Sequence, residues 1–137
     1  MNGVLLDTCA AIWFSDGEKL RPEAAAEFDA AAEGATRIYI SPISAWEVGL
    51  LVSRGRYLSR VEVTRWFDHL VEGGGFLVAD LPPRLFAASS FLPGRPPADP
   101  ADRIIVATAR EYGFRIMTRD RKILDYADQG HVQVVAC

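Results

Sequence analysis

The sequence predicts an α/β fold in which helices flank a mainly parallel sheet of four to five strands. Two observations support this prediction. Short apolar runs alternate with longer helical patterns along the whole chain, and strands that are separated by helices form parallel sheets. The helical patterns begin at proline, serine or aspartate and end near glycine, which are common helix boundaries. The chain of 137 residues has the length of a single domain, 1–137.

The first strand is predicted at Val4–Leu6, where a short apolar run ends abruptly at Asp7. Asp7 then caps a helix that runs through Phe14, because aspartate is a favoured N-cap residue. Pro22 opens a second helix that ends near Gly34, with proline at its first position and glycine after its end. The other expected strands span 37–40, 76–79, 114–118 and 132–135.

The remaining helices have the same boundary signals. Ser41 is expected to cap a helix that starts at Pro42 and ends near 54–55. The glycine triplet at 73–75 stops a helix at 61–70, and the proline-rich segment 93–97 forms a loop. Further helices are predicted at 82–91, 100–112 and 120–126.

Composition limits the class of protein. Hydrophobic residues make up 50% of the chain and charged residues 24%, which is a globular composition. No apolar run approaches the roughly 20 residues that a membrane span needs, and the first residues lack the features of a signal peptide. Cys9 and Cys137 are expected to be free thiols in a reducing compartment. These features predict a cytoplasmic protein with no membrane partner.

The charge balance leaves nucleic-acid binding open. The net charge is −3, from 15 basic and 18 acidic residues, and phosphate contacts need cations. If four carboxylates hold a divalent metal, however, the net charge of the remaining residues rises from −3 to +1. Many of the cations are arginines, which suit phosphate better than lysines. Net charge therefore neither supports nor excludes RNA as a ligand.

Two carboxylates follow predicted strands directly. Asp7 comes after the first strand, and Asp120 comes one residue after the strand at 114–118. Ligands bind at the carboxyl ends of the strands in open α/β sheets, so both are expected at the same edge. Each is also a candidate N-cap, since a helix follows both, and a capping carboxylate keeps a lone pair free.

Two further carboxylates are expected to face this edge from helices. Glu47 lies in the second turn of its helix and interrupts the apolar stripe; a glutamate at the border of the stripe is the alternative. Asp99 is expected to cap the helix at 100–112, with Asp102 in its first turn. Asp102 shares the apolar face of that helix, so it is expected to point toward the sheet.

Converging carboxylates raise one another's pKa unless a cation neutralises them. A set of oxygen donors suits Mg²⁺ or Mn²⁺, whereas the only histidines, His69 and His131, lack the spacing of a zinc site. Two metal ions held in this way can drive in-line cleavage of a phosphodiester. The candidate catalytic and metal-binding residues are Asp7, Glu47, Asp102 and Asp120.

Four motifs resemble those of the PIN-domain ribonucleases, and in particular of VapC toxins from VapBC toxin–antitoxin pairs. Leu-Leu-Asp-Thr at 5–8 resembles the opening motif, and Ser-Pro-Ile-Ser-Ala-Trp-Glu-Val at 41–48 resembles the segment with a helical glutamate. Asp-Pro-Ala-Asp-Arg at 99–103 resembles the family's Asp-Pro-x-Asp-Arg helix. Thr-Arg-Asp at 118–120 resembles the motif that follows the fourth strand. These motifs cover nearly the whole chain.

The resemblance implies a three-layer PIN fold, endoribonuclease activity that depends on Mg²⁺ or Mn²⁺, a homodimer, and inhibition by a cognate VapB-type antitoxin. It implies that the four candidate carboxylates form the family's acidic quartet, and that Asp99 is a further metal ligand. The residues expected to contact metal-bound water or the RNA phosphates are Thr8, Arg103, Thr118 and Arg119. Ser44 is a further candidate for such a contact, although packing on the helix surface is the simpler interpretation.

Other basic and aromatic residues have two interpretations each. Arg121 neighbours an acidic motif but also suits a solvated surface. Arg54, Arg56, Arg60 and Arg65 form a group that could guide RNA, receive an acidic antitoxin tail or be ordinary surface. Relatives often carry a lysine near 51–53, where this chain has none. Most aromatic residues are expected in the core, and Trp66 with Phe67 could also line a groove for an antitoxin helix.

Three alternatives also use a strand-end aspartate in an α/β domain. A hydrolase with an aspartate nucleophile needs a second acid two residues after Asp7, where Cys9 stands. A receiver-like phospho-aspartate signalling module would use Asp80, but the chain has no early acidic pair and no late strand lysine. The third alternative is a PIN nuclease of RNA processing, or one that acts on DNA, outside any toxin system.

Overall fold

The sheet has five strands, and all of its neighbouring pairs are parallel. The computed structural model describes residues 3–137; Met1 and Asn2, with which the predicted domain begins, lie outside the described residues. The strand order is β3-β2-β1-β4-β5, so the first strand of the chain occupies the centre. The strands are β1 (Val4–Leu6), β2 (Ile38–Ile40), β3 (Leu77–Val78), β4 (Arg115–Thr118) and β5 (Gln133–Ala136).

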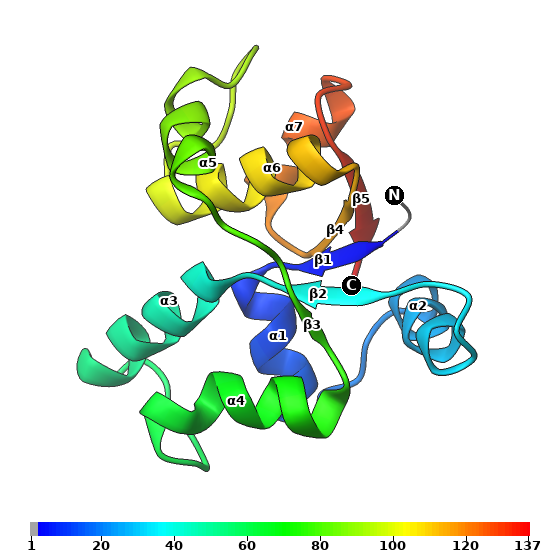
Figure 1. Cartoon of the computed structure of the whole chain (residues 1–137), viewed down its shortest axis with the longest axis vertical. Helices are drawn as coiled ribbons and strands as arrows, with labels where there is room; N and C mark the ends of the chain where they lie inside the picture. Colours follow the sequence, from blue (N-terminus) through cyan, green and yellow to red (C-terminus); the bar gives the residue numbers. More distant parts are fainter. Residues whose placement is uncertain (1–2) are drawn as a thin grey trace.

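Helices cover both faces of this sheet, which confirms the predicted three-layer α/β arrangement (Figure 1). One layer contains α1 (Thr8–Ser15), α2 (Pro22–Ala32), α3 (Pro42–Ser53) and α4 (Val63–Gly74). The other contains α5 (Pro83–Ala88), the short 3₁₀ helix η1 (Ser89–Phe91), α6 (Pro100–Tyr112) and α7 (Arg121–Asp128). Among the described residues, no helix is both long enough and apolar enough to cross a membrane.

Three predicted elements differ most in extent. The strand expected at 76–79 is reduced to Leu77–Val78, which pairs only with β2 at the edge of the sheet. The helix expected at 82–91 is divided into α5 and η1. Helix α4 continues through two glycines of the triplet and ends at Gly75, where φ is 69°. Only that third glycine takes the left-handed conformation that ends helices.

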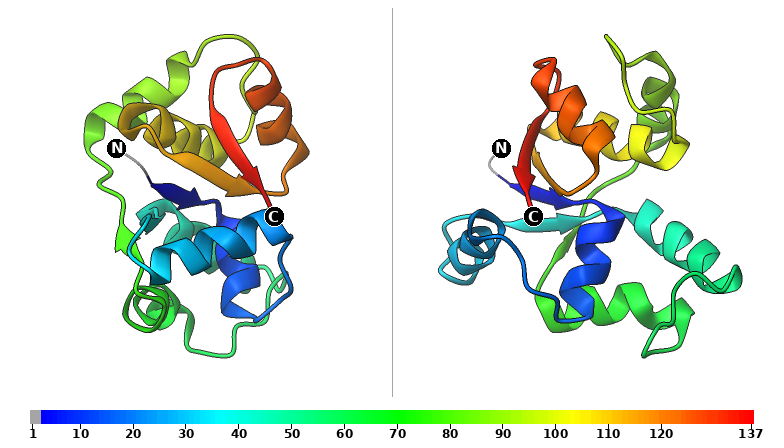
Figure 2. Two further views of the ribbon diagram at one scale, coloured as in Figure 1. Left: turned by 90° about the vertical axis from the view of Figure 1, so that its right-hand side faces the viewer. Right: turned by 180° about the vertical axis from the view of Figure 1, so that it is seen from behind.

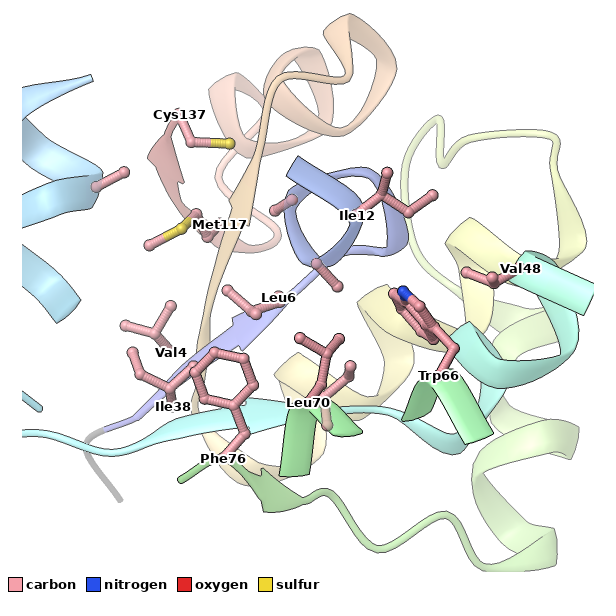
Figure 3. Packing of buried hydrophobic residues seen from close by; sticks show 14 residues of the cluster. Val4, Leu6, Ile12, Ile38, Val48, Trp66, Leu70, Phe76, Met117 and Cys137 are labelled. Atoms are coloured by element: carbon pink, nitrogen blue, oxygen red, sulfur yellow. The ribbon is translucent and has the colours of Figure 1, made fainter. Parts of the chain in front are cut away.

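Strand β1 separates two clusters of buried side chains. Val4 and Leu6 face the cluster formed with α1, α2 and α4, whereas Leu5 faces the cluster formed with α6 and α7. All three side chains are fully buried, because successive side chains of a strand point to opposite faces and both faces are covered. Figure 3 shows the first cluster, which includes Leu6, Ile12, Val48, Trp66, Leu70 and Phe76.

Most aromatic residues follow the expected core packing, and the exposed exceptions are Trp46, Phe86 and Phe91. Trp66 is buried, and its ring nitrogen donates a hydrogen bond to Ser15 Oγ at 3.3 Å. Phe67 is partly buried against the same cluster. Trp46 instead is 55% exposed on α3, because it lies on the face of α3 opposite the buried Ser44 and Val48.

Candidate active site

The site is built around the carboxyl ends of the two central strands, β1 and β4. The strands are in parallel register, with Leu6 beside Met117, and the backbone N–H of Asp7 donates to the Met117 carbonyl at 3.1 Å. Asp7 and Thr118 therefore leave the sheet side by side. The Thr118 hydroxyl donates to Asp7 Oδ2 and accepts a hydrogen bond from the backbone N–H of Asp120 at 2.9 Å.

Both strand-end aspartates are also N-caps. Asp7 Oδ1 accepts from the backbone N–H of Ala10 at 2.7 Å at the start of α1. Asp120 Oδ1 accepts from the backbone N–H of Lys122 at 2.9 Å at the start of α7. Each cap holds its carboxylate at the carboxyl edge of the sheet, which confirms the predicted capping role of both residues.

Glu47 is linked to the same edge through Thr8. Thr8 is the first residue of α1, and its hydroxyl donates to Glu47 Oε1 on α3. The Ser44 hydroxyl lies 2.9 Å from the Thr8 oxygen, and because the Thr8 hydrogen is directed at Glu47, Ser44 is the donor of this pair. Glu47 is only partly exposed, in agreement with its predicted position in the apolar stripe. Thr8 and Ser44 are both buried.

Helix α6 supplies the remaining acids. Asp99 is exposed and caps the helix, with its Oδ2 accepting from the backbone N–H of Asp102 at 3.0 Å. Asp102 is partly buried in the first turn. The pKa of Asp102 is raised to about 8, first by burial and then by the charges of Asp99, Asp120, Glu47 and Asp7, in that order of importance. Asp102 therefore lies near the other three acids of the predicted quartet.

The electrostatics of Asp7 and Glu47 agree with this grouping. The pKa of Asp7 is raised to about 6, because burial and the charges of Asp120 and Glu47 outweigh the hydrogen bonds from Thr118 and Ala10, which lower it. Burial also raises the pKa of Glu47, although the Thr8 hydrogen bond opposes this. Because the charges of the quartet act on one another, the acids from four distant segments share one region of the structure.

Cys9 is a member of this region that sequence reasoning did not assign to the site. It is exposed in the first turn of α1. Burial of the sulfur raises the pKa of its thiol to about 12, and the charges of all four acids of the quartet contribute. Its position directly after the Asp-Thr motif is the only signal in the sequence that could have indicated this.

The donor set fits a hard divalent cation by its chemistry. Among residues 3–137 no member of the quartet forms an ion pair with lysine or arginine, so their negative charge is left without a protein counter-ion. In the same residues, no three histidine, cysteine or acidic side chains are arranged to hold a metal ion as they stand. The oxygen ligands that Mg²⁺ or Mn²⁺ prefers are thus gathered at one edge but are not preassembled into a coordination shell.

The predicted RNA-contacting residues have structural partners. Thr8 and Thr118 are buried and hold Glu47 and Asp7. Arg103 reaches toward the Ser89 carbonyl with an N–O distance of 3.5 Å. The Arg119 guanidinium lies 3.8 Å from the centre of the Trp13 ring, and its Nε donates to the Cys137 carbonyl at 2.6 Å. A role in binding RNA stays a prediction for all four.

The comparisons with known proteins agree with the fold. The family model described as "PIN domain" matches residues 4–129. The chain is 34% identical over 123 residues to Ribonuclease VapC22 of Mycobacterium tuberculosis, covering 90% of this chain and 91% of that protein.

Two solved structures share the fold. A VapBC2 crystal structure from Rickettsia felis, bound to a promoter DNA fragment, matches with a TM-score of 0.70 and 13% identity over 98% of both chains. The FitAcB structure from Neisseria gonorrhoeae matches with a TM-score of 0.54 and 23% identity, over 96% of this chain and 95% of that one. The extent of the family match and the identity to the mycobacterial protein establish that this chain belongs to the PIN-domain family, as a VapC-type ribonuclease.

Proposed function

We propose that this chain is a metal-dependent endoribonuclease that acts as the toxin of a toxin–antitoxin pair. The observation that carries the proposal is the gathering of Asp7, Glu47, Asp102 and Asp120 at the carboxyl edge of a PIN-domain sheet. The relative from Mycobacterium tuberculosis is named as a ribonuclease, which supports RNA as the substrate. Membership of the PIN-domain family leaves no support for the receiver-like alternative.

The quartet would hold Mg²⁺ or Mn²⁺, with Asp99 as a further candidate ligand. When bound, the metal supplies Lewis-acid chemistry for phosphodiester hydrolysis. The protein's part is to orient the ligands: Thr118 holds Asp7 Oδ2 and Thr8 holds Glu47 Oε1. Because each carboxylate oxygen has further lone pairs, both acids keep acceptor capacity for a cation. Arg103 and Arg119 are the predicted contacts for the RNA backbone.

Replacement of Asp7 or Asp120 by asparagine tests the catalytic proposal. Asparagine retains the N-cap at either position, so the fold is preserved while one anionic ligand is lost. We expect cleavage of single-stranded RNA with Mg²⁺ to fall at least about a hundredfold in each variant, as for other groups that stabilise transition-state charge. Asp68→Asn, at an exposed position of α4, is the matched control. Full activity in both site variants would refute the metal mechanism.

An antitoxin partner and a homodimer belong to the same proposal. The solved neighbour from Rickettsia felis is a VapBC2 structure, which supports a VapB-type partner for this chain. Light scattering of the chain alone, and with the product of any adjacent small reading frame, measures both associations. If the chain is a monomer and does not bind this product, the result would favour the alternative, an RNA-processing nuclease outside a toxin system.

A further inference from the structure

A cavity of about 570 Å³ lies beside the acidic site, at the carboxyl ends of β4 and β5. It is formed where the segment that leads into α2 meets the start of α7 and the end of β5; Figure 2 shows this part of the fold from two further sides. The volume lies within the range of small-molecule and cofactor sites. The cavity is therefore large enough to take a nucleotide-sized group.

All charged side chains that line this cavity are basic. Lys19, Arg21, Arg119 and Arg121 line it, and among the described residues no acidic side chain does. Since the whole chain has a net charge of −3, this grouping does not follow from a generally basic surface. A concave site lined by one sign of charge concentrates ligands of the opposite sign, so the cavity favours an anion.

Acidic side chains leave three of the four cations of the cavity unpaired. Within residues 3–137, no acidic side chain forms an ion pair with Lys19, Arg21 or Arg119, and Arg121 has a long surface pair with Asp125 at 3.7 Å. Arg119 is held in place by the Trp13 ring and by the carbonyls of Cys137 and Lys19. An arginine fixed in this way loses little freedom when it binds phosphate.

The cavity and the acidic site share Thr118. This residue lines the cavity, and its hydroxyl is the donor to Asp7. Asp120 lies in the chain between two arginines of the lining, Arg119 and Arg121. An extended anionic ligand can therefore occupy both places at once, with one group at the acids and the next in the cavity.

We propose that this cavity binds a backbone phosphate of single-stranded RNA next to the phosphate that is cleaved, an inference that rests on the proposed ribonuclease function. Arginine and lysine side chains that have room around them suit phosphate, because phosphate accepts several charge-assisted hydrogen bonds. Because the cavity and the acidic site share a wall, an RNA phosphate bound in the cavity fixes which neighbouring phosphate lies at the acids. The cavity thus determines where along the RNA the acids act.

The test measures the salt dependence of RNA binding in a cleavage-deficient Asp7→Asn background. A fluorescein-labelled single-stranded RNA is bound with EDTA present, and its anisotropy is followed between about 50 and 200 mM salt. The double variant Lys19→Ala/Arg21→Ala removes two exposed cations that have no side-chain partner. The matched control Arg37→Ala/Arg84→Ala removes two cations near the amino edge of the sheet, one before β2 and one paired with Glu111 near the end of α6.

Each lost phosphate contact lowers the slope of log K against log salt by about 0.7 for single strands. Because the cavity is proposed to hold one phosphate, the cavity variant is expected to lower the slope by up to about 0.7, which changes the ratio of the two affinities about 2.6-fold over the tested range. The control is expected to keep the slope of the parent. An unchanged slope in the cavity variant, or an equal loss in the control, would overturn the proposal.

Two further outcomes distinguish this proposal from the proposed ribonuclease function and from binding of an acidic protein segment. If the wild-type protein does not cleave RNA but the cavity variant lowers the slope, the proposed ribonuclease function fails while the phosphate site stands. If the cavity variant loses binding to poly-glutamate but keeps its RNA slope, the cavity serves an acidic protein segment, and the RNA assignment is overturned. In the cleavage-competent background, the cavity variant is expected to raise KM for RNA with little change in kcat.

Discussion

Asp7→Asn is expected to stabilise the metal-free protein at neutral pH while it abolishes RNA cleavage. Asp7 is only 4% exposed. Burial, followed in effect by the charges of Asp120 and Glu47, raises the pKa of its carboxyl from 3.8 to about 6. Ionising this group is therefore harder in the folded protein than in the unfolded chain. Asparagine keeps the cap on the N–H of Ala10 but removes the charge, since both residues are good N-caps.

The magnitude follows from the two pKa values. Because the folded-state pKa is the higher one, the folded protein binds more protons between pH 3.8 and about 6, and stability falls across this window as pH rises. The stabilising contribution is complete below pH 3.8 and is lost above about pH 6. At about 1.4 kcal/mol for each tenfold change in proton affinity, the loss is about 3 kcal/mol. The asparagine variant does not suffer this loss.

Urea unfolding followed by circular dichroism, with EDTA present, measures this effect. The free energy of unfolding of Asp7→Asn minus that of the wild type is expected to increase by up to about 3 kcal/mol between about pH 3.5 and pH 7.5. Asp68→Asn, at an exposed position of α4, is expected to show the pH profile of the wild type. If Asp7→Asn is destabilised equally at both pH values, the charge of Asp7 does not oppose folding and the reasoning is refuted.

Three other predictions address the metal, the threonine link and the core. Binding of Mg²⁺ or Mn²⁺ should release protons near neutral pH, because burial and neighbouring acids raise the pKa of Asp102 to about 8 and metals bind the ionised form. Calorimetry in buffers of different ionisation enthalpy measures this release, and proton-neutral binding would contradict it. Thr118→Val removes the hydroxyl that donates to Asp7; it should lower the free energy of unfolding by about 1–3 kcal/mol and reduce cleavage. Thr118→Ser should recover most of both, and a fully stable, active valine variant would exclude the link. Leu6→Ala, at a fully buried position of the central strand, should lower the free energy of unfolding by about 2–5 kcal/mol. Leu58→Ala, at a position 91% exposed, should change it little, and similar urea midpoints for the two variants would count against the described core.

Local features of the sequence predicted most of the secondary structure. Asp7, Ser41, Asp99 and Asp120 are all N-caps at the expected places, because a capping hydrogen bond joins residues that are two or three positions apart. The predictions were less accurate where local signals compete. The third strand is shorter than expected because only Tyr39 and Ile40 of β2 pair with it, and pairing is not a local property.

The assignment of roles within the site depended more strongly on the fold. Thr8 and Thr118 were expected to contact water or RNA, and the structure also gives them protein partners, Glu47 and Asp7. No pattern of neighbouring residues indicates this, since the second pair is separated by 111 positions in the chain. The basic cavity likewise combines residues near position 20 with others near 120 and 137.

The sequence alone determined the α/β class, the helix starts and the acids that follow strands, since periodicity and capping act over a few residues. Only the tertiary structure decided which side chains meet at the carboxyl edge. That outcome depends on β1 lying between β2 and β4 in a defined register, and burial of β1 on both faces sets this order. Long-range packing, which local signals do not encode, therefore brings the four acids together and places the basic cavity beside them.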